Sequence, residues 1–301
     1  MITPQMVQIL SRSRLWAIQA DAVVQAVLLA THGATGWEAS KPSLKGRPGN
    51  KTAHIPIEGV LSKDGPAWYG SNYNTISNAL EQATADPDVK HIVLSVDSPG
   101  GEVVGLPETA ALIAQAAQAK PVTAVVEGMS ASAAYYLASQ ARDVISTPSG
   151  QIGSVGVRMM HADMSKMLDN AGVKITELFS GDFKTEWSPY TPLSDAAKED
   201  MQPRLAAMHQ QFIDAVSAGR GTRASADIQT ARYGEGRMFS ASAAAANGMI
   251  DRVQSPREFY ASLAPVKEEP NAVSLPLRAR FGVDAAKINP NLLKFAKVIT
   301  S

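Results

Sequence analysis

Apolar runs alternate with helical patterns through the middle of this 301-residue chain. Each short run typical of a buried strand is followed by a segment with apolar residues at helical spacing. The expected strands are 54–61, 91–96 and 122–127, and the expected helices are 72–84, 106–119 and 132–141. Because a strand–helix–strand unit brings its two strands together in parallel, we predict an α/β fold with a parallel sheet.

The remaining segments are arranged around this body. Residues 1–52 are expected to form N-terminal helices, 4–12 and 15–31, and a linker rich in Gly, Pro and Lys, 32–51. Further strands are expected at 143–146, 154–160 and 174–179, helices at 164–171 and 194–218, and a strand–helix–strand unit at 238–253. The main domain is therefore expected over 53–263, with a polar linker or tail over 264–301.

Composition restricts the partners and the compartment. Basic and acidic residues both number 28, so a net charge of zero predicts no binding to nucleic acid or to an anionic membrane. The absence of cysteine removes disulfides and thiolate sites and fits a reducing cytoplasm. Polar residues interrupt the apolar stretch 15–30, so neither a membrane span nor a signal peptide is expected there. No cluster resembles a metal or phosphate site, so no cofactor is expected.

Ser132 follows the expected strand 122–127 and a turn at 128–130, at the start of a helix. Backbone N–H groups at a helix start favour developing negative charge, which suits a nucleophile of acyl transfer. The structural alternative is a helix N-cap, a common position for serine. Ser130 is the better cap candidate because it precedes the helical run, which leaves Ser132 for chemistry.

Other residues supply the parts that such a serine needs. Gly100 and Gly101 end the expected strand 91–96, where glycine lets a backbone N–H approach a substrate carbonyl or simply makes a turn. Lys184 lies between Phe183 and Trp187, and it is either solvated or, if buried there, a base. A histidine base would most plausibly be His161, whose alternative role is structural.

Four segments together resemble the signal peptide peptidase A family of Ser-Lys peptidases, within the Clp protease/crotonase superfamily. They are Val96–Gly101 (VDSPGG), Ala131–Tyr136 (ASAAYY), Gly153–Val157 (GSVGV), and Gly236–Phe239 (GRMF) leading to Asn247–Asp251 (NGMID). The resemblance covers roughly 54–253 and implies the ββα superhelix of that superfamily.

The same resemblance implies a role for each candidate residue. Ser132 is the implied nucleophile, Lys184 the general base, and the N–H groups of Gly101 and Ala133 the oxyanion hole. Ser154 is implied to orient the lysine, although its glycine neighbours also fit a tight strand entry. Ala133 and Ala134 stand where the family usually has glycines, which narrows the expected pocket.

No membrane anchor is expected in this chain, and extra segments are expected at both of its ends. In these two respects the chain resembles the bacteriophage prohead peptidases of this family. That branch implies a serine endopeptidase without a cofactor, assembled as a homo-oligomeric ring in the host cytoplasm or procapsid. The implied substrates are scaffold, portal or the chain's own tail. The alternatives are a host-type soluble peptidase, a Clp-like triad with His161, a crotonase-type acyl-CoA enzyme, and a catalytically silent capsid-assembly protein.

Overall fold

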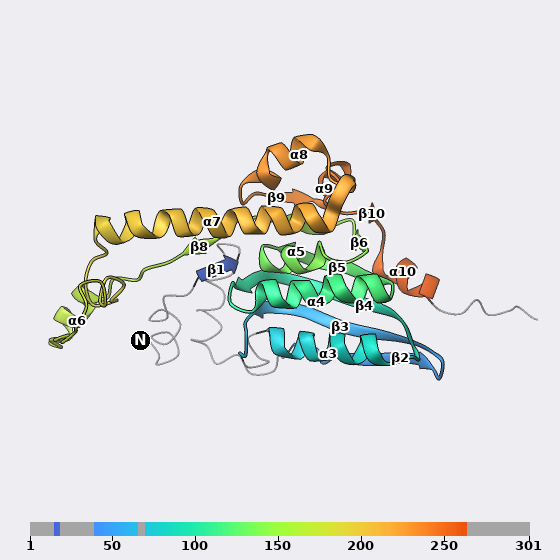
Figure 1. Ribbon diagram of the computed structural model, residues 1–301, viewed down its shortest axis with the longest axis horizontal. Coiled ribbons are helices and arrows are strands. Elements are labelled where there is room, and N and C mark those ends of the chain that lie inside the picture. The colour runs from blue at the N-terminus through green and yellow to red at the C-terminus, as the bar shows by residue number, and fades with distance from the viewer. Residues whose placement is uncertain (1–14, 19–38, 66–69, 264–301) are drawn as a thin grey trace, which may run out of the picture. The chain divides into compact units, whose positions relative to one another are not determined.

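The computed structural model describes residues 15–18, 39–65 and 70–263 (Figure 1). Its strands are β1 (Leu15–Ile18), β2 (Ser43–Arg47), β3 (Asn50–Leu61), β4 (Val89–Glu102), β5 (Val122–Ala131), β6 (Asp143–Ser146), β7 (Gln151–Gly153), β8 (Arg158–Met159), β9 (Met238–Ser240) and β10 (Arg252–Val253). Its helices are α3 (Tyr73–Ala85), α4 (Leu106–Ala119), α5 (Ala133–Ala138), α6 (Ser165–Asn170), α7 (Asp195–Arg220), α8 (Ala226–Thr230), α9 (Ala241–Ala246) and α10 (Pro256–Leu263), with short 3₁₀ turns after α7 and α8.

The strands form one mixed sheet with a parallel centre. β3, β4, β5 and β6 pair in parallel in that order, β10 joins β6 in parallel, and β7 pairs in parallel with the end of β5. Antiparallel pairs lie at the margins, where β2 joins β3, β1 joins both β4 and β8, and β9 joins β7. The prediction of an α/β fold with a parallel sheet is confirmed.

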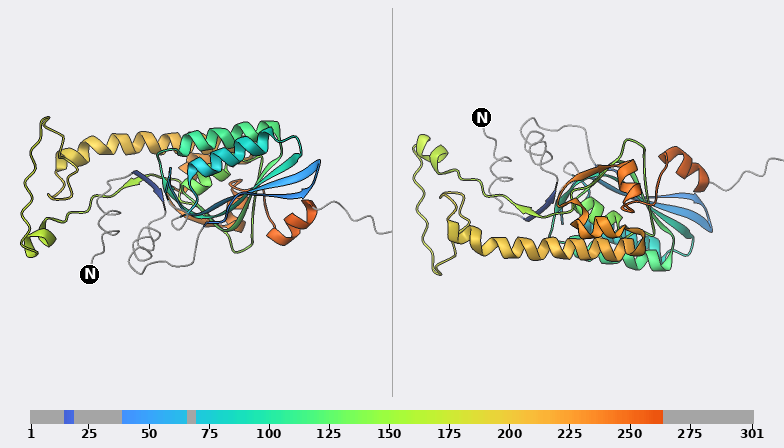
Figure 2. Two further views of the ribbon diagram at one scale, coloured as in Figure 1. Left: turned by 90° about the horizontal axis from the view of Figure 1, so that it is seen from below. Right: turned by 90° about the horizontal axis from the view of Figure 1, so that it is seen from above.

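Helices α3, α4 and α5 lie side by side along one face of this sheet (Figures 1 and 2). The buried residues of α3 recur at helical spacing, at Tyr73, Ile76, Leu80 and Ala83, because only that stripe faces the sheet. Asn72 caps the helix by accepting a hydrogen bond from the Thr75 N–H, a contact worth about 1 kcal/mol. Helix α5 is buried along its whole length, so it forms part of the core beside the parallel strands.

Two N-terminal predictions are wrong within the described residues. Leu15–Ile18 forms strand β1 rather than the start of a helix, because the edge of β4 supplies backbone partners for it. The predicted linker 32–51 contains β2 and the start of β3, which form a hairpin whose turn includes Gly49 at φ 78°. Residues 1–14 and 19–38 lie outside the described residues, so the other N-terminal helix remains a prediction.

Two later strand predictions also fail. Residues 174–179 have no regular structure, and their apolar side chains are exposed instead of packed; Leu178 is 94% exposed. The predicted strand 154–160 is reduced to Arg158–Met159, because only that part finds a partner, β1. The long helix is confirmed as α7, with Ser194 as its N-cap and Pro203 inside it.

Residues between β8 and α7 form an arm, which we define as 160–194. Figures 1 and 2 show α6 and the N-terminal end of α7 extending away from the sheet. The other end of α7 returns to the core, where Phe212 contacts Tyr136 of α5 at 4.9 Å between ring centroids. At a rise of 1.5 Å per residue, the arm joins α7 about 25 Å along the helix from that contact.

The chain divides into two compact units, Met1–Pro256 and Arg257–Ser301. The described part of the second unit ends with α10 at Leu263. The predicted tail 264–301 lies outside the described residues and remains a prediction. Among the described helices, none combines the length and the hydropathy needed to cross a bilayer.

A buried ion pair links α7 to the turn before β10. The Arg220 side chain is fully buried and donates to both carboxylate oxygens of Asp251, at 3.1 and 2.9 Å. We expect Asp251→Ala to lower the free energy of unfolding by about 3–5 kcal/mol, because the buried guanidinium loses its counter-charge. Urea unfolding measures this; the matched variant Asp200→Ala removes only an exposed pair with Arg204 and is expected to change little.

The same pair predicts a pH dependence of stability. Burial disfavours the charged Asp251 carboxylate, but hydrogen bonds from Arg220 and the Val144 N–H together outweigh it and lower its pKa. A lowered folded pKa means that the carboxylate stabilises the fold above its ordinary pKa of about 3.9, and that this contribution is lost as the pH falls further. The loss of stability between about pH 5 and about pH 3 should therefore be smaller in Asp251→Ala than in the wild type.

Candidate active site

Ser132 occupies the single residue between β5 and α5. Its backbone has φ 54° and ψ −123°, and its N–H donates to the Gly153 carbonyl at 2.8 Å. The hydroxyl makes no capping hydrogen bond to the helix. Ser130 is not the cap that the sequence suggested, because β5 continues through the predicted turn and holds Ser130 buried within the strand.

The Ser132 backbone is strained. A positive φ is rare for residues other than glycine, and such conformations cost of order 1–3 kcal/mol. In the described part of the chain it is found outside glycine at five positions, which include both candidate serines: Ser132, Ser154, Arg232, Tyr233 and Glu235. The strain holds Ser132 in a sharp turn from strand to helix, and strained conformations of this kind are concentrated at functional sites.

The last paired residues of β4 and β5 lie shortly before the two predicted oxyanion donors. Ser98 of β4 pairs with Ser130 of β5, and Gly101 and Ala133 each lie three residues beyond that pair. Ala133 is the first residue of α5, so its N–H has no partner within the helix. An oxyanion hole needs two backbone N–H groups that point at the oxygen of the tetrahedral intermediate, and the N–H groups of Gly101 and Ala133 are the predicted pair.

Gly100 and Gly101 do not follow the strand, as the sequence suggested, but lie within β4, where residues without a predicted role hold them. The Ser98 hydroxyl donates to the Gly59 carbonyl at 2.6 Å and accepts from the Gly100 N–H at 3.1 Å. A Cβ atom on Gly101 would lie 1.9 Å from the Leu61 carbonyl oxygen, so only glycine fits against β3. The serine before the proline was the available signal, but its hydrogen bond to β3 depends on tertiary pairing.

Ser154 lies beside Ser132. Strand β7 pairs with β5 in the register Ala131 to Gly153, so the two serines follow paired residues on neighbouring parallel strands. Ser154 has φ 53°, is 9% exposed, and is held by its N–H donating to the Arg237 carbonyl at 2.8 Å. The Ser132 hydroxyl points to the same loop, where the Gly156 carbonyl lies 3.4 Å away.

The two candidate bases both lie on the arm. Lys184 is exposed in the turn that follows Gly181. His161 has its Nε2 atom 3.1 Å from the Thr191 carbonyl, and its ring lies edge-on to Trp187 at 6.2 Å. Within one protomer, the described contacts thus place Ser132 and Ala133 beside Ser154, and Gly101 on β4 three residues beyond its last pair with β5, but join neither Lys184 nor His161 to Ser132.

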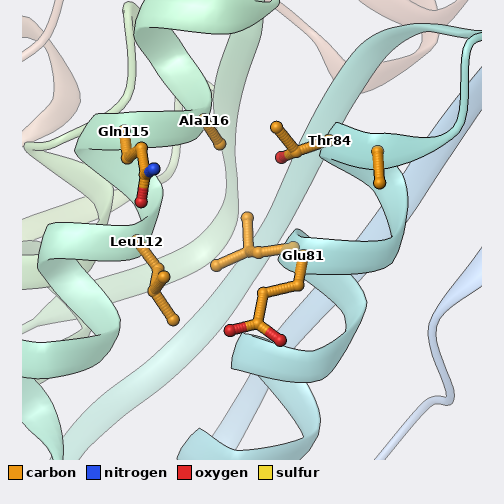
Figure 3. A pocket seen from close by; sticks show the side chains of 7 residues that line it. Glu81, Thr84, Leu112, Gln115 and Ala116 are labelled. Carbon is orange, nitrogen blue, oxygen red and sulfur yellow. The ribbon is translucent and has the colours of Figure 1, made fainter.

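Other features of the described residues do not add a second site. Figure 3 shows a pocket between α3 and α4, lined by Leu80, Glu81, Thr84, Ala85, Leu112, Gln115 and Ala116, none of which is a predicted site residue. Across the described ranges, no group of three His, Cys, Asp or Glu side chains is arranged to hold a metal.

Comparison with models of protein families gives one match. Residues 114–268 match the model of Peptidase family S49, slightly more than half of the sequence. The chain belongs to peptidase family S49. The S49 match includes Ser132, Ala133, Ser154 and Lys184, whereas Gly101 precedes it.

Two relatives of this S49 chain come from bacteriophages. Capsid assembly protease C of Escherichia phage lambda is 35% identical over 208 residues, covering 68% of this chain and 46% of that protein. Head-tail preconnector protein GP5 of Enterobacteria phage P21 is 34% identical over 185 residues, covering 60% of this chain and 37% of that protein. The chain thus spans less than half the length of these relatives.

Similarity to solved structures is weaker. The 1510-N membrane-bound stomatin-specific protease, in complex with a substrate peptide, aligns with a TM-score of 0.42 and 16% identity, over 71% of this chain and 83% of that one. Because this similarity is low, the fold is defined by the strand order and register of the chain itself.

Proposed function

We propose that this S49 chain is a serine endopeptidase in which Ser132 attacks peptide bonds with Lys184 as the general base. The observation that carries the proposal is the strained Ser132 between β5 and α5, with Gly101 and Ala133 each three residues beyond the last pair of β4 with β5. A hydroxyl in a sharp strand-to-helix turn, at the start of a helix whose first N–H groups have no partner within the helix, is suited to acyl transfer.

The reaction proceeds in two stages. The uncharged Lys184 amine takes the Ser132 proton as Oγ bonds to the substrate carbonyl carbon, and the N–H groups of Gly101 and Ala133 hold the resulting oxyanion. Lys184 then protonates the leaving amine as the peptide C–N bond breaks. Water, deprotonated by the same amine, attacks the acyl-enzyme, releases the acid product and restores Ser132. Ser154, next to Ser132, orients the amine.

A second copy of the chain completes this site. An amine works as a base only when it is uncharged, and burial against apolar groups favours that form. Lys184 is exposed in a single protomer, on an arm that leaves the sheet (Figures 1 and 2). We infer that the arm of one protomer packs against a neighbour and delivers Lys184 to the neighbour's Ser132.

Exposed apolar side chains on the arm support this assembly. Leu178, Phe183 and Phe179 are 94%, 75% and 56% exposed, and Val173 and Ile175 are also exposed. So many large apolar side chains on one short segment are typical of a protein–protein interface. Because the same segment carries Lys184, its burial and the assembly of the dyad would be one event, as in a closed ring with one contact per protomer.

The proposed substrates are proteins of a phage head: scaffold, portal or the chain's own tail, cleaved in the host cytoplasm or procapsid. The support is the 35% identity to a phage capsid assembly protease and the 34% identity to a head-tail preconnector protein. A host-type peptidase that degrades loose peptides is the second candidate. The two are distinguished by whether the purified chain cleaves co-expressed head proteins at defined positions or degrades unfolded casein without preference.

A covalent probe tests the proposed chemistry directly. We expect a fluorophosphonate to bond to the Ser132 Oγ with loss of fluoride, which raises the mass of the intact chain by one adduct. Peptide mapping should place the adduct on residue 132, and heat-unfolded chain should remain unlabelled. If the native assembly carries no adduct on Ser132 and does not cleave casein, the results would favour a catalytically silent capsid-assembly protein.

A further inference from the structure

Strand β1 fills a gap that opens where β4 and β5 separate. The pairing of β4 with β5 ends at Ser98 and Ser130. Beyond that point β4 continues to Glu102, while β5 leads into Ser132 and α5. β1 pairs antiparallel with this extension of β4, in the register Ile18 to Gly100, Ala17 to Gly101 and Trp16 to Glu102.

The register shows which edge of β4 holds β1. A strand has two hydrogen-bonding edges, and β3 pairs along one of them as far as Gly101. The other edge is used first by β5 and then by β1. β1 therefore lies on the same side of β4 as Ser132, beside the N–H of Gly101 proposed for the oxyanion hole.

The opposite edge of β1 is also paired. β8 joins it antiparallel, with Leu15 opposite Met159 and Trp16 opposite Arg158. β8 begins two residues after Gly156, whose carbonyl lies 3.4 Å from the Ser132 hydroxyl. β1 is thus held between the two segments that border the nucleophile, and both of them offer backbone groups to an extended chain.

We propose that the slot between Gly100–Glu102 and Arg158–Met159 binds substrate as an extended antiparallel strand, and that Leu15–Ile18 of the chain itself competes for it. The inference rests on the proposed function. Backbone pairing on both edges recognises an extended polypeptide largely without regard to side chains. β1 and substrate need the same hydrogen bonds, so the slot opens to substrate only in the fraction of molecules that have released β1.

This competition predicts a specific kinetic effect. Proline at position 17 removes a backbone N–H and fixes φ within a strand of four residues, at the position that pairs with Gly101 of β4, so it should weaken the pairing of β1. We expect Ala17→Pro in the full-length chain to lower KM for an unstructured peptide by about five- to tenfold with kcat unchanged, since saturating substrate displaces β1 in either chain. Ala17→Ser keeps the N–H and is the matched control.

The outcomes separate this inference from the proposed function. Active chains with the same KM in Ala17→Pro and Ala17→Ser would overturn the competition and leave the peptidase intact. Chains that neither cleave peptide nor accept the fluorophosphonate at Ser132 would overturn the peptidase itself and the inference with it. A KM that rises in Ala17→Pro would show that β1 builds the slot instead of filling it, and would also overturn the inference.

Hydrogen exchange on the unaltered chain avoids any effect of proline on folding. β1 pairs with β4 over residues 16–18 and with β8 over residues 15–16, so the amides of β1 that bond across these pairs should exchange slowly in the free protein. Labelling Ser132 with a peptidyl fluorophosphonate, whose peptide part occupies the slot, should speed their exchange by about tenfold or more as β1 is displaced. A small alkyl fluorophosphonate should leave them protected. Equal exchange with both probes would contradict the proposal.

Discussion

Ser132→Ala is expected to lower kcat for peptide hydrolysis by about 10⁴-fold or more, with KM little changed. The hydroxyl is the proposed attacking group, whereas the oxyanion donors and the strand slot are backbone groups that the substitution leaves in place. Initial rates over a range of peptide concentrations separate the two parameters. The fluorophosphonate adduct should also disappear from this variant.

Ser130→Ala is the matched control for that measurement. Ser130 lies two residues earlier on β5, is equally buried, and has a hydroxyl with no hydrogen-bond partner among the described residues. Its loss removes no contact, so kcat should stay within about twofold of the wild type. Retained activity in Ser132→Ala, or an equal loss in both variants, would contradict the role of Ser132 as nucleophile.

Lys184→Met is expected to lower kcat by about 10³-fold, because a positioned general base contributes about 10²- to 10⁴-fold. Lys174→Met removes an exposed lysine from the same arm and should keep its activity. Lys184→Met lacks the amine that takes the Ser132 proton, so the fluorophosphonate should also react more slowly with this variant. Loss of activity in His161→Ala with an active Lys184→Met chain would assign the base to His161 instead.

Mixing two inactive chains tests whether the dyad forms between protomers. Co-expressed Ser132→Ala and Lys184→Met chains should recover about a quarter of the wild-type activity, because about one interface in four then joins an intact Ser132 to an intact Lys184. Each chain expressed alone should stay inactive. If the mixture also stays inactive while it assembles normally, the two residues do not meet across an interface.

Local patterns were sufficient for the body of the fold. The spacing of apolar residues predicted α4 over Leu106–Ala119 with its observed bounds and α3 and α7 within a few residues. α3 and α4 bury one stripe of apolar residues, and α7 buries Phe212, Ile213 and Val216 near its C-terminal end. The same patterns failed for Leu15–Ile18, where a few apolar residues fit a helix and a strand equally well. The neighbouring strand decided between them.

For the candidate site too, some features were predictable from the sequence and others were not. Ser132 and Gly101 were predicted from strand ends in the sequence, and Ala133 and Ser154 from the family resemblance. The parallel register of β5 and β7 brings Ser132 and Ser154 together, and β4 pairs with β5 up to three residues before Gly101. The positive φ of Ser132 and of Ser154 was not predicted, because it arises from the pairing of Ser132 and Ser154 with Gly153 and Arg237. The relation of Lys184 to the serine was not predictable either, since the arm extends away from its own sheet.

The succession of strands and helices, and the chemical groups at each strand end, could be predicted from the amino-acid sequence because both depend on residues close together in the chain. That β1 enters the sheet beside Ser132 and that residues 160–194 leave the sheet as an arm is seen only in the folded chain. The cause is that an unpaired strand edge or an exposed apolar segment is satisfied by whichever partner is nearest in space. Such partners are distant in sequence, and for the arm we infer that the partner is another copy of the chain.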